Sequence, residues 1–179
     1  LAAATAGYQA AIMVPTELLA RQHSRWLAPW AASRGVNMEC LTGTTSSGLK
    51  EQILDGLANG DIKILVGTHA LLEPEVLFSR LGLAVIDEQH RFGVRQRASL
   101  REKGRADHHQ CPHLLVMTAT PIPRTLELTV YGDLDVCTIG DMPPGRQPVV
   151  SQVVPVANWS RVVEMLVETV HRGEQAYVV

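Results

Sequence analysis

Residues 81–90 read LGLAVIDEQH, and they give the clearest indication of the fold. The apolar run Leu81–Ile86 predicts a strand, and two adjacent carboxylates, Asp87 and Glu88, follow it directly. Because apolar residues occupy both alternating sets of positions, the strand is expected to be buried on both faces, as in a parallel sheet. Ligands of such sheets bind beyond the carboxyl ends of the strands, so the two acids fall where a ligand would lie.

Strand-like and helical segments alternate on both sides of this stretch. A helix is expected over 16–34, with Thr16 as its N-cap and Gly35 as its stop. A second helix would place apolar residues on one face, namely Leu49, Ile53, Leu54 and Leu57. Further strands are expected at 8–14, 36–41, 62–66 and 114–117. This alternation predicts an α/β fold, a parallel sheet with helices on both faces.

A proline-rich segment interrupts this pattern. Residues 141–148 read DMPPGRQP, which cannot continue a helix or a central strand. We predict a first domain over 1–140, a linker over 141–150 and the start of a second α/β domain over 151–179. The expected elements of that second domain are strands at 152–156 and 175–179 around a helix that contains Val162, Val163, Leu166, Val167 and Val170. Since the chain does not open with methionine, we expect it to be a piece of a longer protein.

The composition excludes some classes of function but does not identify the function. The chain has 179 residues and a net charge of −2, so nucleic-acid binding must rest on local sites rather than on overall charge. No apolar run reaches the roughly 18 residues of a membrane span, so no membrane partner is expected. Cys40, Cys111 and Cys137 are scattered and odd in number, which predicts a reducing compartment, the cytoplasm.

The two acids predict a nucleotide hydrolase. Adjacent carboxylates repel each other unless a cation or a proton separates them. In nucleotide hydrolases the first acid holds Mg²⁺, usually through water, and the next orients or deprotonates the attacking water. We assign Asp87 to the metal and Glu88 to the water; the alternative is an exposed turn after a strand. Gln89 and His90 extend the pair to D-E-Q-H.

A second polar motif, TATPIP at residues 118–123, also follows an apolar strand. We expect Thr118 and Thr120 to bond to His90 on the neighbouring loop. Helix N-capping by one of the threonines is the compatible alternative, since the prolines suit the start of a helix.

Taken together, these motifs resemble those of superfamily 2 helicases, and more narrowly those of the bacterial RecG-type branch-migration helicases. The resemblance rests on DEQHRFGV (87–94) and TATPIPRTL (118–126), with support from PTELLARQH (15–23), VGTHAL (66–71) and PPGRQP (143–148). It runs through nearly the whole chain. It implies a RecA-like motor domain that uses ATP and Mg²⁺ to remodel branched or duplex DNA in recombination and repair.

The resemblance also implies roles for individual positions. The implied catalytic residues are Asp87, Glu88, Gln89 and His90, of which Asp87 and Glu88 also bind the cofactor. The implied coupling residues are Thr118, Ala119 and Thr120. The implied DNA contacts are Pro15, Thr16, Thr42, Gly43, Gly67, Thr68 and His69, although plain turn chemistry is the alternative for Thr42 and Gly43.

The implied partners lie elsewhere in the full-length protein: a second helicase domain and a wedge domain that recognises DNA. Single-stranded-DNA-binding protein is a further expected partner. Two alternatives remain open. The transcription-repair coupling factor shares much of this motif set but more usually has a glutamate where Gln89 stands, and a non-catalytic DNA-binding module could keep the fold without the P-loop.

Residues 43–50, GTTSSGLK, have the glycine spacing of a phosphate-binding P-loop, and a lysine follows. However, Leu49 separates the glycine from Lys50, and Glu51 stands where a magnesium-binding hydroxyl belongs. We therefore expect no ATP site here and expect the serines to cap the following helix. Without a P-loop, the chain alone is predicted neither to hydrolyse ATP nor to unwind DNA.

Three weaker signals remain. Trp26 and Trp30 are one helical turn apart, and we expect them to belong to the core rather than to stack on bases. The run HHQCPH at 108–113 contains zinc-type ligands, but its compact spacing favours a loop. A basic stretch is either a solvated helix face or a patch that faces DNA. It comprises Arg91, Arg95, Arg97, Arg101, Lys103 and Arg105.

Overall fold

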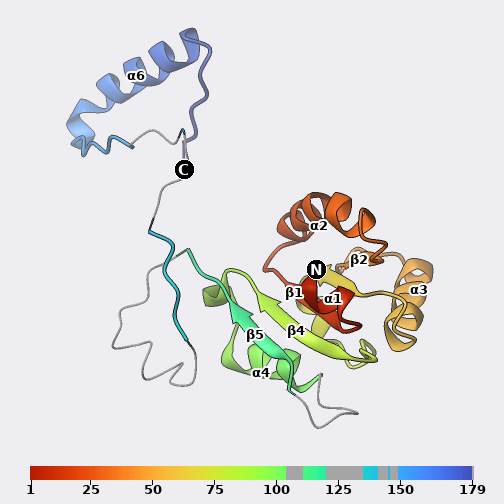
Figure 1. Ribbon diagram of the computed structural model, residues 1–179. Helices are drawn as coiled ribbons and strands as arrows, with labels where there is room; N and C mark the ends of the chain where they lie inside the picture. Colours follow the sequence, from red (N-terminus) through yellow and green to blue (C-terminus); the bar gives the residue numbers. More distant parts are fainter. Residues whose placement is uncertain (104–110, 120–134, 141–144, 146–148, 179) are drawn as a thin grey trace. The chain divides into compact units, whose positions relative to one another are not determined.

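A computed structural model describes residues 1–103, 111–119, 135–140, 145 and 149–178 (Figure 1). The chain divides into two compact units, Leu1–Tyr131 and Gly132–Val179. The domain limits expected from the sequence stay a prediction, because most of 141–150 lies outside the described residues.

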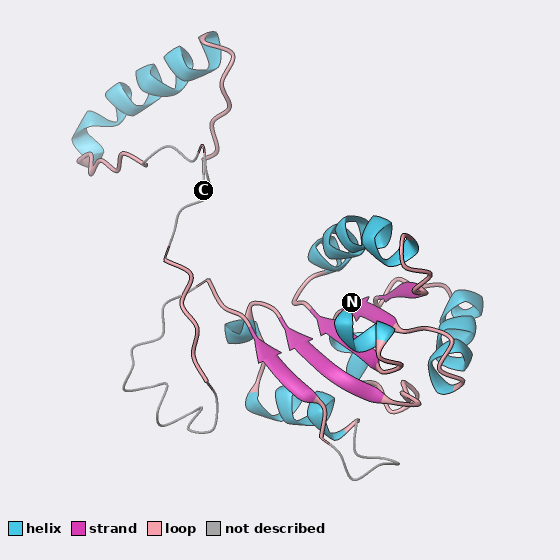
Figure 2. Ribbon diagram, viewed as in Figure 1, coloured by secondary structure: helices cyan, strands magenta, loops and turns pink. Residues whose placement is uncertain are grey.

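The first unit is built on a five-stranded sheet, and Figure 2 shows its strands as magenta arrows. The strand order is β2-β3-β1-β4-β5, and every pair of neighbours is parallel. Each strand lies within two residues of its expected position, so the predicted α/β fold with a parallel sheet is confirmed. The strands are β1 (Gln9–Met13), β2 (Met38–Leu41), β3 (Ile64–Gly67), β4 (Leu81–Ile86) and β5 (His113–Val116).

Helices cover both faces of this sheet, as predicted. One face packs against α1 (Ala2–Thr5) and α2 (Glu17–Ala32), which contribute buried alanines to a shared core. The opposite face packs against α3 (Ser47–Ala58) and α4 (Val94–Glu102). Each fully buried leucine of this second core, such as Leu57, contributes about 1.5–3 kcal/mol of stabilisation.

Local sequence explains the limits of α2. The Thr16 hydroxyl accepts a hydrogen bond of 3.3 Å from the Leu19 backbone N–H, as an N-cap should. After the helix, Gly35 adopts φ +63°, a left-handed conformation that favours glycine. Both features confirm the helix expected at 16–34.

The expectation that Trp26 and Trp30 belong to the core is wrong. Their exposed fractions are 67% and 52%. The buried side of α2 is formed by small residues, Ala20 and Ala31, which let the helix approach the sheet closely. The two tryptophans lie one turn apart on a different side of the same helix, so spacing alone could not assign them to the core.

The second unit contains one α-helix among its described residues, α6 (Trp159–His171), preceded by the short helix η3 (Val156–Asn158). The predicted helix is therefore confirmed. The strands expected at 152–156 and 175–179 are wrong for the residues described, which form no ladder there. A strand needs a neighbour for its backbone hydrogen bonds, and no ladder partner is found in the described part of this unit.

No helix among the described residues has both the length and the apolar character required to cross a lipid bilayer.

Candidate functional site

The carboxyl ends of the five parallel strands bring the predicted motifs to one edge of the sheet. This is the edge at which ligands of parallel sheets bind. The motif residues that follow β1 to β5 in turn are Thr16, Thr42, Thr68, Asp87 and Thr118.

Asp87 directly follows the interior strand β4. Its backbone N–H donates to the Met13 carbonyl at 3.0 Å, so the sheet itself fixes the position of the residue. Both carboxylate oxygens have protein donors: Oδ1 accepts from the Glu88 N–H at 2.9 Å, and Oδ2 lies 3.0 Å from His23 Nε2. The side chain remains 21% exposed, which leaves its carboxylate within reach of a bound ion.

Glu88 turns the chain sharply at the end of β4. Its φ of 51° and ψ of 51° are left-handed, and among the described residues it is the one non-glycine with positive φ. Such a conformation is costly for a residue with a Cβ and is concentrated at functional sites. Within the described part of the chain, the buried Oε2 atom has no hydrogen-bond partner, and it lies 3.4 Å from His90 Nδ1.

The loop of the two acids is joined to the threonine motif through the backbone. The Gln89 N–H donates to the Met117 carbonyl at 3.1 Å, and the Met117 N–H donates to the Ile86 carbonyl at 2.8 Å. Gln89 is buried, whereas His90 is exposed.

Thr118 follows this link and is half-buried, and Ala119 is exposed. Thr120 lies outside the described residues. The hydrogen bonds expected between the two threonines and His90 therefore stay a prediction.

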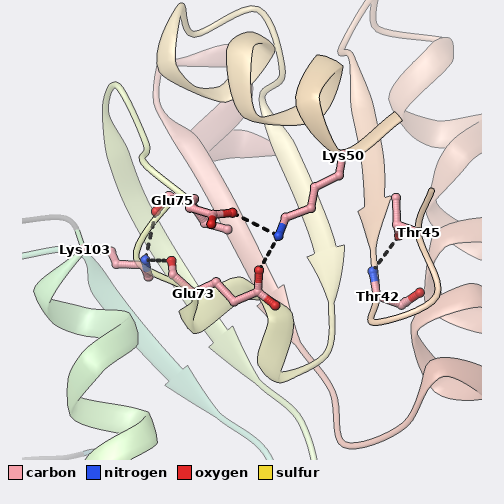
Figure 3. Close-up of polar contacts among 7 residues, drawn as sticks. Thr42, Thr45, Lys50, Glu73, Glu75 and Lys103 are labelled. Atoms are coloured by element: carbon pink, nitrogen blue, oxygen red, sulfur yellow. Dashed lines mark hydrogen bonds and ion pairs between the residues drawn. The ribbon is translucent and has the colours of Figure 1, made fainter. Parts of the chain in front are cut away.

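Around the expected DNA contacts Pro15, Thr16, Thr42 and Gly43, hydroxyl groups form a network. The Thr42 hydroxyl lies 3.2 Å from that of Thr44. The Thr42 N–H donates to the Thr45 hydroxyl at 3.0 Å (Figure 3). Thr42 is buried, while Pro15 is half-buried and both Thr16 and Gly43 are exposed. Thr42 thus shapes the loop, which agrees with the turn chemistry considered for it.

A pocket of about 430 Å³ opens beside this network, between α2 and the start of α3. Sequence reasoning missed Arg21 and Arg25, although their i,i+4 spacing on the helix after Thr16 would have pointed to one basic face. Burial raises the pKa of the Cys40 thiol at this pocket, which keeps that group neutral. The lining residues are Arg21, Ser24, Arg25, Cys40, Thr42, Thr44, Thr45, Ser46 and Leu49.

The third expected DNA motif is Gly67, Thr68 and His69. Gly67 is buried, and a Cβ built on it would overlap the Leu41 carbonyl oxygen and Leu71 Cδ1. Packing therefore explains why this position is a glycine. The Thr68 hydroxyl is buried without a hydrogen-bond partner among the described residues, and the His69 side chain is exposed.

Lys50, the lysine of the P-loop-like stretch at 43–50, forms ion pairs with two carboxylates. Its Nζ lies 2.6 Å from Glu73 Oε2 and 2.9 Å from Glu75 Oε2, and these contacts raise its pKa (Figure 3). Lys50 therefore has a structural use that does not involve phosphate. Ser46 stands at the N-cap position of α3, but its side chain makes no capping hydrogen bond, so the expected capping by this serine is wrong.

The basic stretch expected to face solvent or DNA includes one residue that points inward. Lys103 Nζ donates to the Glu73 carbonyl at 2.6 Å and to the Val76 carbonyl at 2.9 Å (Figure 3). Burial lowers the pKa of Lys103. Lys103 does not belong to an exposed patch, whereas Arg91, Arg95 and Arg101 are exposed.

Three or more potential metal ligands do not cluster anywhere in the described part of the chain. His108 and His109, two of the four ligands considered for zinc, lie outside it. A hard cation such as Mg²⁺ needs only one or two carboxylates, and the adjacent pair at Asp87 and Glu88 is compatible with that chemistry.

Comparison with known proteins agrees with this architecture. Residues 1–129 match the DEAD/DEAH box helicase family, and the chain belongs to that family. The class indicated by the parallel sheet and its acid loop is thus a helicase motor domain, and ATP binding is a property of the family.

The particular resemblance is to the ATP-dependent DNA helicase RecG. The RecG proteins of Synechocystis sp. and Aquifex aeolicus are 49% and 45% identical over 179 residues, which is 100% of this chain and 21% or 22% of theirs. The chain therefore spans little more than a fifth of the length of these relatives. The resemblance inferred from the sequence motifs is confirmed.

A solved structure described as RecG bound to a three-way DNA junction is similar with a TM-score of 0.74 and 44% identity. It covers 93% of this chain, which corresponds to 22% of that protein. The DUF1998 helicase MrfA, at 21% identity and a TM-score of 0.54 over 73% of this chain, shares the fold alone.

Proposed function

We propose that the chain is part of an ATP-dependent DNA helicase that remodels branched DNA, such as replication forks and Holliday junctions, in recombination and repair. The observation that carries this proposal is the alignment of acids, hydroxyls and arginines along one edge of a parallel sheet in a DEAD/DEAH box helicase chain. Similarity to RecG along the chain supports branched DNA as the substrate.

At the nucleotide end of this edge, Asp87 would hold Mg²⁺ through water and Glu88 would position the attacking water. The buried Glu88 Oε2 without a hydrogen bond supports this assignment, because such an atom is costly unless a ligand or water satisfies it. When bound, Mg²⁺ neutralises charge that develops on the phosphates. The phosphate cradle itself would come from the longer protein.

At the DNA end, the pocket beside α2 would receive a backbone phosphate. Arg21 and Arg25 supply positive charge, the threonine and serine hydroxyls supply donors, and the N-terminus of α3 adds backbone N–H groups. Contacts of this kind position the duplex without reading its sequence, which suits an enzyme that moves along DNA.

Between these ends, Gln89, His90, Thr118, Ala119 and Thr120 would couple the nucleotide state to the loops that face DNA. The backbone hydrogen bond from Gln89 to Met117 supports this role, because it would transmit a shift of the acid loop to the threonine motif. The second helicase domain, the wedge domain and single-stranded-DNA-binding protein complete the proposed set of partners, and the cytoplasm is the proposed location.

The proposal can be tested with the parent protein, extended at both ends to the length of its relatives. We expect ATP-dependent strand separation of a labelled three-way junction, with much slower separation of a linear duplex. Strand separation that needs a stalled RNA polymerase would instead favour the transcription-repair coupling factor. Binding without any ATP-dependent separation would favour the non-catalytic module.

The DNA pocket has its own test. Arg21→Ala and Arg25→Ala should each weaken junction binding and reduce the slope of log affinity against log salt by about 1. Arg34→Ala, which removes a charge just after the C-terminal end of α2 and outside the pocket, is the control. An unchanged slope in both pocket variants would contradict the assignment of the phosphate site.

A further inference from the structure

His23 makes a contact that no local feature of the sequence predicts. This histidine lies on α2, and its Nε2 is 3.0 Å from Asp87 Oδ2 across the sheet edge. An ionised carboxylate can only accept hydrogen bonds, so Nε2 is the donor. Because the other Asp87 oxygen already accepts from the Glu88 N–H, His23 fixes the remaining freedom of the carboxylate.

The same helix also contacts the loop that carries the proposed phosphate site. The Thr44 hydroxyl donates to Glu17 Oε2 at 2.8 Å, and Arg21 Nη2 donates to the Thr44 hydroxyl at 3.4 Å. Residues 17, 21 and 23 all lie within the first two turns of α2, a hydrogen-bonded and therefore rigid element. One short piece of helix thus contacts the DNA-facing loop on one side and the proposed metal acid on the other.

We propose that His23 is a positioning residue that couples DNA binding to the orientation of the Asp87 carboxylate. When DNA occupies the phosphate pocket, α2 would move. This movement would change the length and direction of the hydrogen bond from His23 to Asp87. That change would alter how well the acid presents its oxygens to a metal–nucleotide complex. The inference rests on the proposed function, because it requires Asp87 to be the metal acid and the pocket to bind DNA.

Among the described contacts, His23 is the one side-chain link between α2 and Asp87. The link from Gln89 to Met117 leads to the threonine motif instead, and the bond from Asp87 N–H to the Met13 carbonyl belongs to the sheet. Removal of the His23 imidazole should therefore disconnect the two sites, while the pocket keeps its lining and Asp87 keeps its bonds to the Glu88 N–H and the Met13 carbonyl.

A linkage measurement on the parent protein tests this inference. The affinity for a fluorescent ATP analogue with Mg²⁺ is measured with and without a saturating three-way junction, and the ratio of the two dissociation constants is the coupling factor. Reciprocity requires the nucleotide to change the junction affinity by the same factor, which provides an internal check. Melting temperatures show whether each variant is folded.

Three variants separate the hydrogen bond from other effects. His23→Leu keeps much of the volume and removes the donor, whereas His23→Gln keeps an N–H donor on a side chain of similar reach. Gln22→Leu makes the same replacement at the neighbouring exposed position. We expect a wild-type coupling factor of at least about fivefold, within the usual allosteric range.

We expect His23→Leu to bring the coupling factor to within about twofold of one, and His23→Gln and Gln22→Leu to keep it near the wild-type value. Wild-type coupling in His23→Leu would overturn the inference and leave the proposed function standing, as would a wild-type protein that binds both ligands independently. A wild-type protein that binds no nucleotide or no junction would overturn the proposed function and the inference together.

Discussion

Replacement of Gly67 by alanine should destabilise the first unit strongly, although it adds only one methyl group. Gly67 ends the interior strand β3 and pairs with Leu41 of β2. A Cβ at this position would overlap the Leu41 carbonyl oxygen and lie 3.1 Å from its carbonyl carbon. Ordinary contacts between carbon atoms are about 3.5–4.0 Å long, so the two strands would have to separate locally.

The expected loss combines two effects. Overpacking of a well-packed interior costs about 1–3 kcal/mol. The nearby hydrogen bond from the Thr68 N–H to the Leu41 carbonyl, 3.3 Å long, would weaken as well, a loss of about 1 kcal/mol. A total near 3 kcal/mol corresponds to a decrease in melting temperature of roughly 10 °C for a unit of this size.

Urea and thermal unfolding of the 179-residue chain, followed by circular dichroism, would measure this loss. Gly48→Ala is the matched control, because no atom lies within 4 Å of a Cβ built at that helical position. Alanine there should stabilise the chain by about 0.5–1 kcal/mol. If Gly67→Ala unfolded like the wild type, the packing explanation for this glycine would be refuted.

Three further predictions concern the polar groups. Lys103→Met should lower the free energy of unfolding by about 1–2 kcal/mol at pH 7, because two carbonyls lose their donor. Since the folded pKa of Lys103 lies below the ordinary value of 10.5, the unfolded chain binds more protons between the two values. The stability of the wild type relative to Lys103→Met should therefore rise with pH between the folded and unfolded pKa values of Lys103. A fall in stability over this pH range would contradict the lowered pKa of Lys103. Reversing Arg95 and Arg97 to glutamate should weaken junction binding by the parent protein, and an unchanged salt slope would exclude this patch from the DNA interface. His90→Ala in the parent protein should preserve ATP hydrolysis and abolish branch migration; unimpaired migration would argue against coupling through this residue.

The sequence was sufficient to predict the sheet and the position of its functional edge. Strands such as β4 are buried on both faces, so their apolar runs are continuous, and a polar residue marks the point where each run ends. Asp87 and Thr16 were found in this way because strand ends and helix caps are local features of the sequence. The glycine stop at Gly35 is equally local.

Features that depend on distant contacts could not be predicted. The contact between His23 and Asp87 joins residues 64 positions apart, and nothing local marks the histidine as a partner. Lys103 resembled its exposed neighbours because its inward direction is set by two carbonyls of a loop far away in the sequence. The face of α2 that bears Trp26 could not be assigned because the buried face is defined by small alanines rather than by large apolar residues.

DNA-stimulated ATP hydrolysis should be compared between two proteins, this 179-residue chain and the proposed parent protein, lengthened at both ends to match its RecG relatives. We predict turnover by the parent protein alone, its loss in Glu88→Gln, and its retention in Glu51→Gln, an exposed control on α3. Turnover by the chain alone that Glu88→Gln removes would contradict the expectation that the phosphate cradle lies elsewhere. Turnover by neither protein would contradict the helicase function itself.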